Sequence, residues 1–530
     1  MPILAYIQKK ETKLLMLVKT FGSAVYGVEA ITITIEVNSM GTSTNYMIVG
    51  LPDNAVKESF QRVESTIKVA GYTMPRTRIV VNMAPADIKK SGAAFDLPIA
   101  VGILAASGQI NNPEAIEQYV IMGELSLDGA IRPIKGGLPI AIQARKEGFK
   151  GLIVPAENAK EAGMVNNLSV YGVKHITEVI AFIESGEKSL QPVTIDTREE
   201  FFTSQYDFDI DFSDVKGQEN IKRALEIAAA GGHNAILIGP PGAGKTMLAK
   251  RLPTILPPLS LHEALETTKI HSVAGKLPEH SSLVSRRPFR SPHHSISDAG
   301  LVGGGGVPQP GEISLAHNGV LFLDELPEFK RTVLEVMRQP MEERRVTISR
   351  AKIAIDFPAS FMLIASMNPC PCGYYNHPDR ECTCPPGAVQ KYLNKISGPL
   401  LDRIDLHVEV TPVAFSELST QKPQEESASI RERVIKAREK QAERYKDLPG
   451  VYCNAQITSK MLKDVCAIST PGQNLLKSAI EKLNLSARAY DRILKVSRTI
   501  ADLAQSDDIK IEHLAEAIHY RNLDREGWAG

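Results

Sequence analysis

The eight residues from Gly239 to Thr246, GPPGAGKT, constrain the fold of this chain more than any other segment. This Gly-x4-Gly-Lys-Thr pattern follows the apolar run AILI and precedes the helix-forming run MLAKRL. Such a loop between a strand and a helix turns backbone N–H groups toward a phosphate chain, aims its lysine at the β and γ phosphates, and offers a hydroxyl to Mg²⁺. The segment therefore predicts a site for ATP and Mg²⁺ in a parallel α/β sheet.

We assign nucleotide binding to the whole loop. Lys245 also takes a catalytic role, and the Thr246 hydroxyl is a Mg²⁺ ligand. The predicted cofactor-binding residues are Gly239, Pro240, Pro241, Gly242, Ala243, Gly244, Lys245 and Thr246.

Two later apolar strands end in polar residues that complete such a site. GVLFLDEL brings Asp324 and Glu325 to the end of a strand, where the first carboxylate can hold hydrated Mg²⁺ and the second can orient or deprotonate the attacking water. FMLIASMN ends at Asn368, which could polarise the same water. These three residues are predicted to lie beside the phosphate loop.

Arg403, in LLDRIDLHVEV, is a candidate for stabilising the charge that develops on the phosphates. A guanidinium remains protonated and can bind phosphate through two hydrogen bonds. The alternative is a structural salt bridge to Asp402 or Asp405.

A chain of 530 residues is too long for one hydrophobic core, and its sequence pattern changes several times. Short β-rich runs alternate with helical patterns on both sides of an acidic, aperiodic stretch, and the end of the chain is helical. The predicted division is an extension at 1–15, with disorder as one interpretation, an α/β domain at 16–186, a linker at 187–213, a nucleotide-binding domain at 214–412, a linker at 413–429 and a helical domain at 430–530.

The composition and the apolar pattern limit the kinds of partner and the compartment that we expect for this protein. Lys plus Arg and Asp plus Glu both number 61, so any contact with a polyanion must come from a local patch. The sequence has neither an apolar run of 18 residues nor a signal-peptide pattern, so we expect a cytoplasmic protein with no membrane partner.

Four of the six cysteines form two close pairs, which suits structural Zn²⁺. The single-residue gap within each pair is tighter than usual for zinc, two disulfides or unligated thiols are the alternatives, and His377 could replace one ligand. Cys453 and Cys466 are isolated and are expected to be core or surface residues. The predicted zinc ligands are Cys370, Cys372, Cys382 and Cys384.

The adjacent histidines His293 and His294 have no assigned role. Neighbouring residues on a strand point to opposite faces, so we do not expect them to share a metal.

The order of these parts resembles the AAA+ ATPases, and within them the branch that contains the magnesium chelatase ATPase subunit and the MCM helicases. In that branch the arginine finger reaches the ATP of a neighbouring subunit, so the resemblance implies a ring, a homo-hexamer. Arg488, in SARAYDRILKVSRTIADL, matches the sensor 2 arginine, with a surface helix charge as the alternative. The implied catalytic residues are Lys245, Glu325, Asn368 (sensor 1), Arg403 (finger) and Arg488, with Asp324 as the Mg²⁺ ligand of the Walker B pair.

The segments from Pro288 to Phe329 and from Asn368 to Tyr375 closely resemble the ComM/YifB family of bacterial magnesium-chelatase-like proteins. The resemblance implies a hexameric DNA helicase that drives branch migration when imported DNA is recombined in natural transformation. The alternatives are a chelatase-like or chaperone-type ATPase that remodels proteins and an ATP-dependent Lon-like protease.

Two segments are candidates for contacting single-stranded or branched DNA. Glu342 to Ala359 is predicted to form two β-rich runs joined at a basic tip, where Arg350 and Lys352 could contact phosphates. A solvated hairpin is the alternative. Gly303 to Pro310 resembles the helix 2 insert of this branch, a loop that faces the pore.

The N-terminal domain resembles the Lon-type peptidase fold. A Lon-type site needs a nucleophilic serine and an activating lysine, but the matching positions are Ala94 and Pro139. Ser91 and Lys135 lie nearby but do not match, so we expect no peptidase activity. The predicted fold class is α/β, with a Lon-protease-like domain, an AAA+ domain around a parallel sheet, and a C-terminal helical lid.

Overall fold

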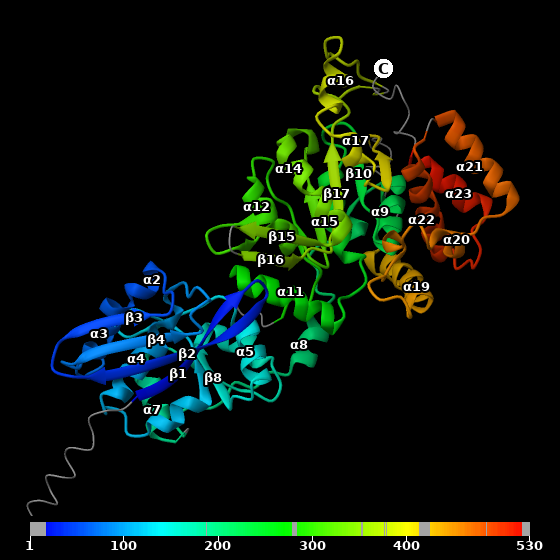
Figure 1. Ribbon diagram of the computed structural model, residues 1–530. Helices are drawn as coiled ribbons and strands as arrows, with labels where there is room; N and C mark the ends of the chain where they lie inside the picture. The colour runs from blue at the N-terminus through cyan, green and yellow to red at the C-terminus, as the bar shows by residue number, and fades with distance from the viewer. Residues whose placement is uncertain are drawn as a thin grey trace, which may run out of the picture.

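The computed structural model describes residues 17–186, 188–277, 283–350, 353–375, 377, 379–412, 424–483 and 485–521. Figure 1 shows an N-terminal α/β region, a second α/β region beside it, and a group of C-terminal helices on the far side of the second region. This arrangement confirms the predicted fold class.

The N-terminal region is built on a mixed seven-stranded sheet within the described residues. Along its second strand Ile33, Ile35 and Val37 alternate with more exposed neighbours, and all three are fully buried. This period of two places one face of the strand against the core. In spatial order the strands are β3 (Asn45–Val49), β4 (Arg78–Ala84), β2 (Glu29–Met40), β1 (Leu17–Tyr26), β5 (Tyr119–Ile121), β8 (Gly151–Pro155) and β9 (Ser169–Val173).

Helices pack on this sheet. Helix α4 (Asp96–Ala106) contacts β1 and β2, and all of its residues are buried. A helix that is apolar all round belongs in a domain interior. Helix α5 (Gly137–Lys146) contacts β2 and β8, and α3 (Ser59–Val69) packs against α4. The antiparallel pairs β1–β2 and β2–β4 precede parallel pairs from β1 through β5 and β8 to β9.

The second region contains a five-stranded sheet in which every described pair is parallel. Its strands VLFL and MLIASM are buried at every position, as a sheet covered on both faces requires. All strands of a parallel sheet end at the same edge, so the loops that follow them meet there. In spatial order they are β11 (Phe289–Arg290), β14 (Val320–Leu323), β17 (Met362–Met367), β10 (Ala235–Ile238) and β18 (Leu406–Glu409).

The C-terminal region is helical, as predicted. Helix α22 (Ala487–Leu503) is amphipathic and packs its buried face against α9 (Glu219–Gly231), α19 (Ser427–Tyr445) and α23 (Ile511–His519). Helix α21 (Thr470–Leu483) packs against α23. Because α9 leads directly into β10, its packing with α22 attaches the helical region to β10 of the parallel sheet.

The N-terminal region contacts the parallel-sheet region through α11 (Leu261–Ala274), which packs against α5. The Ser272 hydroxyl donates a hydrogen bond to the buried Glu161 carboxylate at 2.6 Å, and the Gly136 N–H donates to the Ser272 carbonyl at 3.1 Å. The stretch expected to be an aperiodic linker contains a helix, α8 (Thr197–Ser204).

Candidate functional site

The phosphate loop lies between β10 and α10 (Lys245–Arg251), as its sequence predicts. Gly242 and Gly244 have φ values of 78° and 85°, a backbone region that glycine enters at little cost. The Lys245 ammonium is 2.7 Å from the Gly239 carbonyl oxygen and 3.2 Å from the Asn368 Oδ1 atom. Burial lowers the pKa of Lys245. The loop therefore holds its lysine next to the strand-end asparagine.

Asp324 follows β14 and faces the loop. Its Oδ2 atom accepts a hydrogen bond from the Thr246 hydroxyl at 2.7 Å, and its Oδ1 atom accepts from the Ser366 hydroxyl in β17. A hydroxyl and a carboxylate are ligands that suit hydrated Mg²⁺ beside phosphates. The donor set at this edge of the sheet thus fits the metal. The role of Ser366 was not predicted from the sequence, because its contact with Asp324 depends on the order of the strands.

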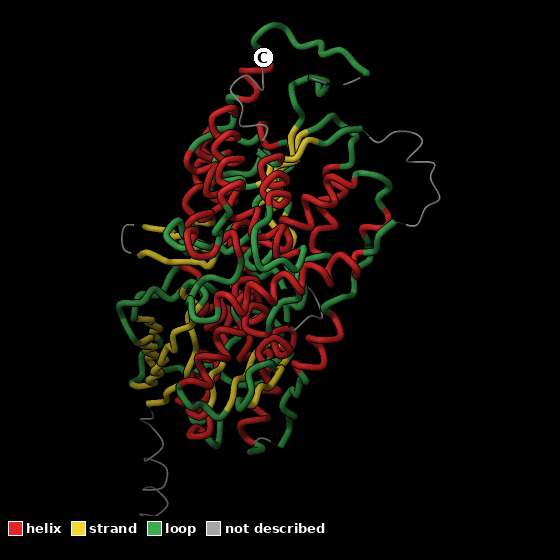
Figure 2. Tube along the Cα trace, turned by 90° about the vertical axis from the view of Figure 1, so that its right-hand side faces the viewer, coloured by secondary structure: helices red, strands yellow, loops and turns green. Residues whose placement is uncertain are grey.

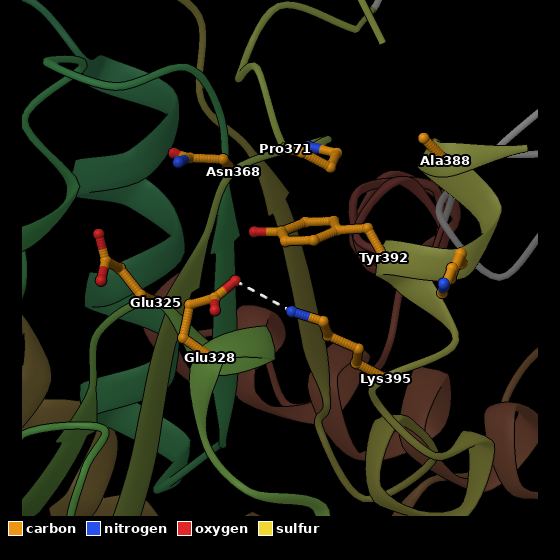
Figure 3. A pocket seen from close by; sticks show the side chains of 8 residues that line it. Glu325, Glu328, Asn368, Pro371, Ala388, Tyr392 and Lys395 are labelled. Carbon is orange, nitrogen blue, oxygen red and sulfur yellow. Dashed lines mark hydrogen bonds and ion pairs between the residues drawn. The ribbon is translucent and has the colours of Figure 1, made fainter. Parts of the chain in front are cut away.

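Glu325 takes a different direction from Asp324. Its backbone is in the left-handed region at φ 54°, and its side chain is 59% exposed. Glu325 and Asn368 line a pocket of about 430 Å³. Figure 3 shows Tyr392 and Lys395 on the opposite side of this pocket. Lys395 is paired with Glu328 at 3.2 Å. The Glu325 carboxylate is therefore open to a water molecule in this pocket.

His293 and His294 do not point in opposite directions, because they lie in a turn after β11 and not on a strand. Their ring centroids are 4.0 Å apart. The Nδ1 atom of His294 is 3.6 Å from a carboxylate oxygen of Glu325. His294 is thus a site neighbour that the sequence did not reveal, since no motif spacing marks it.

Arg403 lies near the amino-terminal ends of the parallel strands, whereas the phosphate loop lies at their carboxyl-terminal ends. We call these the far edge and the loop edge of the sheet. Its carbonyl accepts a hydrogen bond at 3.2 Å from Asn234, which directly precedes β10, whereas the loop directly follows that strand. Four residues of strand span about 13 Å. Arg403 forms a 2.6 Å ion pair with Glu342, not with Asp402 or Asp405, so the partners named as alternatives were wrong.

Arg488 is located at the same edge as Arg403. It lies in the first turn of α22, and its Nη1 atom is 3.1 Å from Asp402 Oδ2. Asp405 is buried, and pairs with Arg492 at 2.9 Å. Both predicted phosphate-binding arginines are therefore separated from the Lys245 of their own chain by the length of β10.

The four cysteines of the two close pairs come together after β17. Their sulfur atoms all lie within 4.8 Å of one another, and all six cysteines of the chain are free thiols in the structure. His377 is outside this group, and its Nδ1 atom accepts a hydrogen bond from the Asp379 N–H.

The candidate DNA-binding segment forms the predicted hairpin. Strands β15 (Arg345–Arg350) and β16 (Ile353–Pro358) pair antiparallel. Lys352 lies outside the described residues, and the side chain of Arg350 is also not described. The glycine-rich segment forms the short pair β12 (Gly303–Gly304) and β13 (Gln309–Pro310).

The two positions at which we predicted that the peptidase dyad is missing lie in helices of the N-terminal region. Ala94 lies in the short helix η1 (Ala93–Phe95), and Pro139 lies in α5. Lys135 packs its side chain close to Gly275 at the end of α11. That lysine therefore takes part in the contact between the two α/β regions.

Three family models match successive parts of the chain. Residues 211–418 match the family described as "Magnesium chelatase, subunit ChlI", residues 35–158 match "Subunit ChlI of Mg-chelatase", and residues 424–521 match "Magnesium chelatase, subunit ChlI C-terminal". The parallel-sheet region is thus an AAA+ ATPase domain.

Three curated relatives are informative. The chain is 45% identical over 507 residues to "Competence protein ComM" of Haemophilus influenzae, covering 95% of this chain and 97% of the relative. It is 44% identical over 505 residues to "Uncharacterized protein YifB" of Salmonella typhimurium, covering 95% and 96%. A segment of 150 residues is 33% identical to "Lon protease 2" of Bacillus subtilis, covering 26% of each chain.

None of the helices in the described residues is long and apolar enough to span a membrane.

Proposed function

Because the chain belongs to the ComM/YifB family of magnesium-chelatase-like AAA+ ATPases, we propose that it forms a ring and couples ATP hydrolysis to movement along DNA and branch migration. The ring is a homo-hexamer in this proposal, and the DNA is a recombination intermediate formed from imported DNA. The relative named "Competence protein ComM" supports the link to DNA uptake.

The observation that carries the proposal is the separation of the two halves of the ATP site. Lys245, Asp324 and Glu325 lie at one edge of the sheet, whereas Arg403 and Arg488 are tied to the other edge. No arginine fixed at that far edge can reach the phosphates bound at its own loop. A neighbouring subunit that presents its far edge to this loop supplies both.

The chemistry follows from the residues at the loop edge. Backbone N–H groups of the loop and the Lys245 ammonium bind the β and γ phosphates. Thr246 and Asp324 hold Mg²⁺, which when bound neutralises charge that develops on the phosphates. Glu325 accepts a proton from the attacking water or orients it, and Asn368 keeps that water in line. Arg403 of the next subunit stabilises the charge on the transferred phosphoryl group.

The β15–β16 hairpin supports DNA contact. Figure 2 shows this pair of strands projecting from the side of the molecule. A projecting hairpin whose first strand ends in an arginine, Arg350, can contact phosphates without reading sequence. In a ring, such hairpins from all subunits face one channel.

The test compares three ATPase rates: without additive, with a four-way DNA junction, and with an unfolded protein. We expect the junction to raise kcat and to be converted to branch-migrated products in an ATP-dependent manner. Stimulation by the unfolded protein alone, without branch migration, would replace this proposal with protein remodelling.

The hairpin is tested by Arg350→Ala against a control at the base of the same strand, Arg345→Ala. Arg345 is 57% exposed and lies near Glu343 and Asp356, so its replacement removes an arginine without changing the tip. We expect Arg350→Ala to weaken DNA binding and DNA-stimulated hydrolysis while ATP binding is retained. If Arg350→Ala binds DNA as tightly as Arg345→Ala and the parent protein do, the hairpin tip does not contact DNA.

A further inference from the structure

The four-cysteine cluster has the geometry of a tetrahedral metal site. The sulfur of Cys370 is 3.3 Å from that of Cys372 and 3.7 Å from that of Cys382, and the last two are 3.5 Å apart. Four sulfurs at about 2.3 Å from one Zn²⁺ lie about 3.8 Å from each other. The sulfurs are therefore spaced for a shared ion and are too far apart for disulfides, which need about 2.05 Å.

The surrounding backbone is arranged as it is around a bound thiolate. Cys370 is fully buried, and its sulfur accepts a hydrogen bond from the Tyr375 N–H at 3.3 Å. The Gly373 N–H donates to the Cys370 carbonyl at 3.0 Å, which closes a tight turn between the first cysteine pair and Tyr375. Amide hydrogen bonds to a ligand atom orient it and tune the metal.

This turn touches both parts of the site that act on the γ phosphate. Asn368 precedes Cys370 by two residues, and Pro371 lines the same pocket as Asn368 and Glu325 (Figure 3). A Cβ atom at Gly373, where φ is 86°, would lie 2.6 Å from the Cδ atom of Pro241 in the phosphate loop. The cysteine turn therefore packs directly on the loop and can carry no side chain at the contact.

We propose that Cys370, Cys372, Cys382 and Cys384 bind one Zn²⁺ ion, and that this site holds Asn368 in register with the phosphate loop. The turn is short and has few apolar side chains of its own, so the metal supplies the cross-links that a core supplies elsewhere. The proposal rests on the ATPase activity of the AAA+ domain and not on the DNA role. Other metals that prefer four thiolates, iron above all, are outcomes of the test.

The first experiment measures metal in the full-length protein purified without chelator. Inductively coupled plasma mass spectrometry should give about one zinc per chain in the parent protein. It should give about none in a Cys372→Ser, Cys384→Ser double variant. The matched control is Cys466→Ala, which removes a buried cysteine outside the cluster and should keep its zinc. Zinc far below one per chain in the parent, or iron in its place, would overturn the assignment.

The second experiment measures the effect on the nucleotide site, without DNA. The double variant should bind a fluorescent ATP analogue but lose kcat on the order of 10-fold or more, since a displaced water-orienting group costs turnover. Cys466→Ala should keep its kcat. Unchanged kcat in the zinc-free double variant would show that the metal does not brace Asn368.

A chelator series on the parent protein keeps the test independent of misfolding in the variant. After the chelator is removed and Mg²⁺ is supplied again, the zinc-free protein should have a lower kcat, and added zinc should restore it, while circular dichroism is monitored for loss of helix. Activity that survives complete zinc removal contradicts the proposal. Because all these assays omit DNA, a protein with zinc-dependent hydrolysis but no DNA response would fail the proposed function alone.

Discussion

Within the described residues, two large sheets are covered by helices, and the residues predicted to carry chemistry are placed differently around them. In the AAA+ sheet, β10, β14 and β17 each lead into polar residues that meet at one edge: Lys245, Asp324 and Asn368. In the N-terminal region, Ala94 and Pro139, the residues that the resemblance to Lon-type peptidases predicts at the dyad positions, lie in helices η1 and α5. A layered α/β architecture therefore supplies positions for chemistry, while the residues at those positions decide whether a reaction takes place.

The largest effect is expected for Arg403→Ala, which removes a group that the loop edge cannot supply for itself. We expect kcat to fall on the order of 10³-fold, the range for a finger that stabilises phosphoryl transfer. Lys245→Ala should be equally inactive. Mixing the two inactive variants should restore part of the activity, because about one interface in four then joins an intact loop to an intact arginine. Absence of any recovery in verified mixed assemblies would contradict a shared site.

The next largest effect is expected for Glu325→Gln, which retains the shape of the side chain but cannot accept a proton. Steady-state hydrolysis should fall by about 10² or more, while ATP binding is retained. Glu328→Gln is the control, since Glu328 lies on the same pocket wall but pairs with Lys395. Equal losses in the two variants would argue against a specific role for Glu325.

A smaller effect is expected where the two sheets are joined. Glu161 is buried and accepts hydrogen bonds from Ser272 and Asn158, both at 2.6 Å. Glu161→Gln places an amide among donors, so we expect a loss of about 1–3 kcal/mol in the free energy of unfolding. Calorimetry measures this loss. The exposed Glu157→Gln on the neighbouring turn is the control and should leave the unfolding transition in place.

The smallest effect is expected for Ser91→Ala in the N-terminal region. ATP hydrolysis should change less than about twofold, as for most surface substitutions outside a site. An unfolded protein incubated with the parent should remain uncleaved. Cleavage by the parent that the Ser91→Ala variant loses would restore peptidase chemistry to the N-terminal sheet.

The predictable part of the site follows the chain locally. Each of the loop-edge residues comes shortly after an apolar run, so a buried strand and its polar end are visible in the sequence as one pattern. The contacts that were missed depend on the order of strands. Ser366 reaches Asp324 because β17 lies beside β14, and Glu342 reaches Arg403 from a distant helix, α15 (Arg338–Glu343). Such partners are set by tertiary packing.

The fold was predictable at the same level. The apolar run VLFL was predicted to be a strand, and it forms β14, which is buried at every position as in a sheet covered on both faces. Helix α8, in the polar stretch before the AAA+ domain, was missed because the acidic composition masks it. The two histidines were wrongly placed on a strand, although Ser291-Pro292 directly before them favours a turn.

The left-handed backbone of Glu325 has a consequence for the evolution of the site. A side chain at φ 54° costs roughly 1 kcal/mol relative to an ordinary backbone angle. Glycine would remove that cost but also the carboxylate. Glu325→Gly should therefore unfold at a higher temperature than Glu325→Ala, although neither hydrolyses ATP. Under the role proposed for Glu325, stability and turnover compete at this residue, and the native glutamate favours turnover.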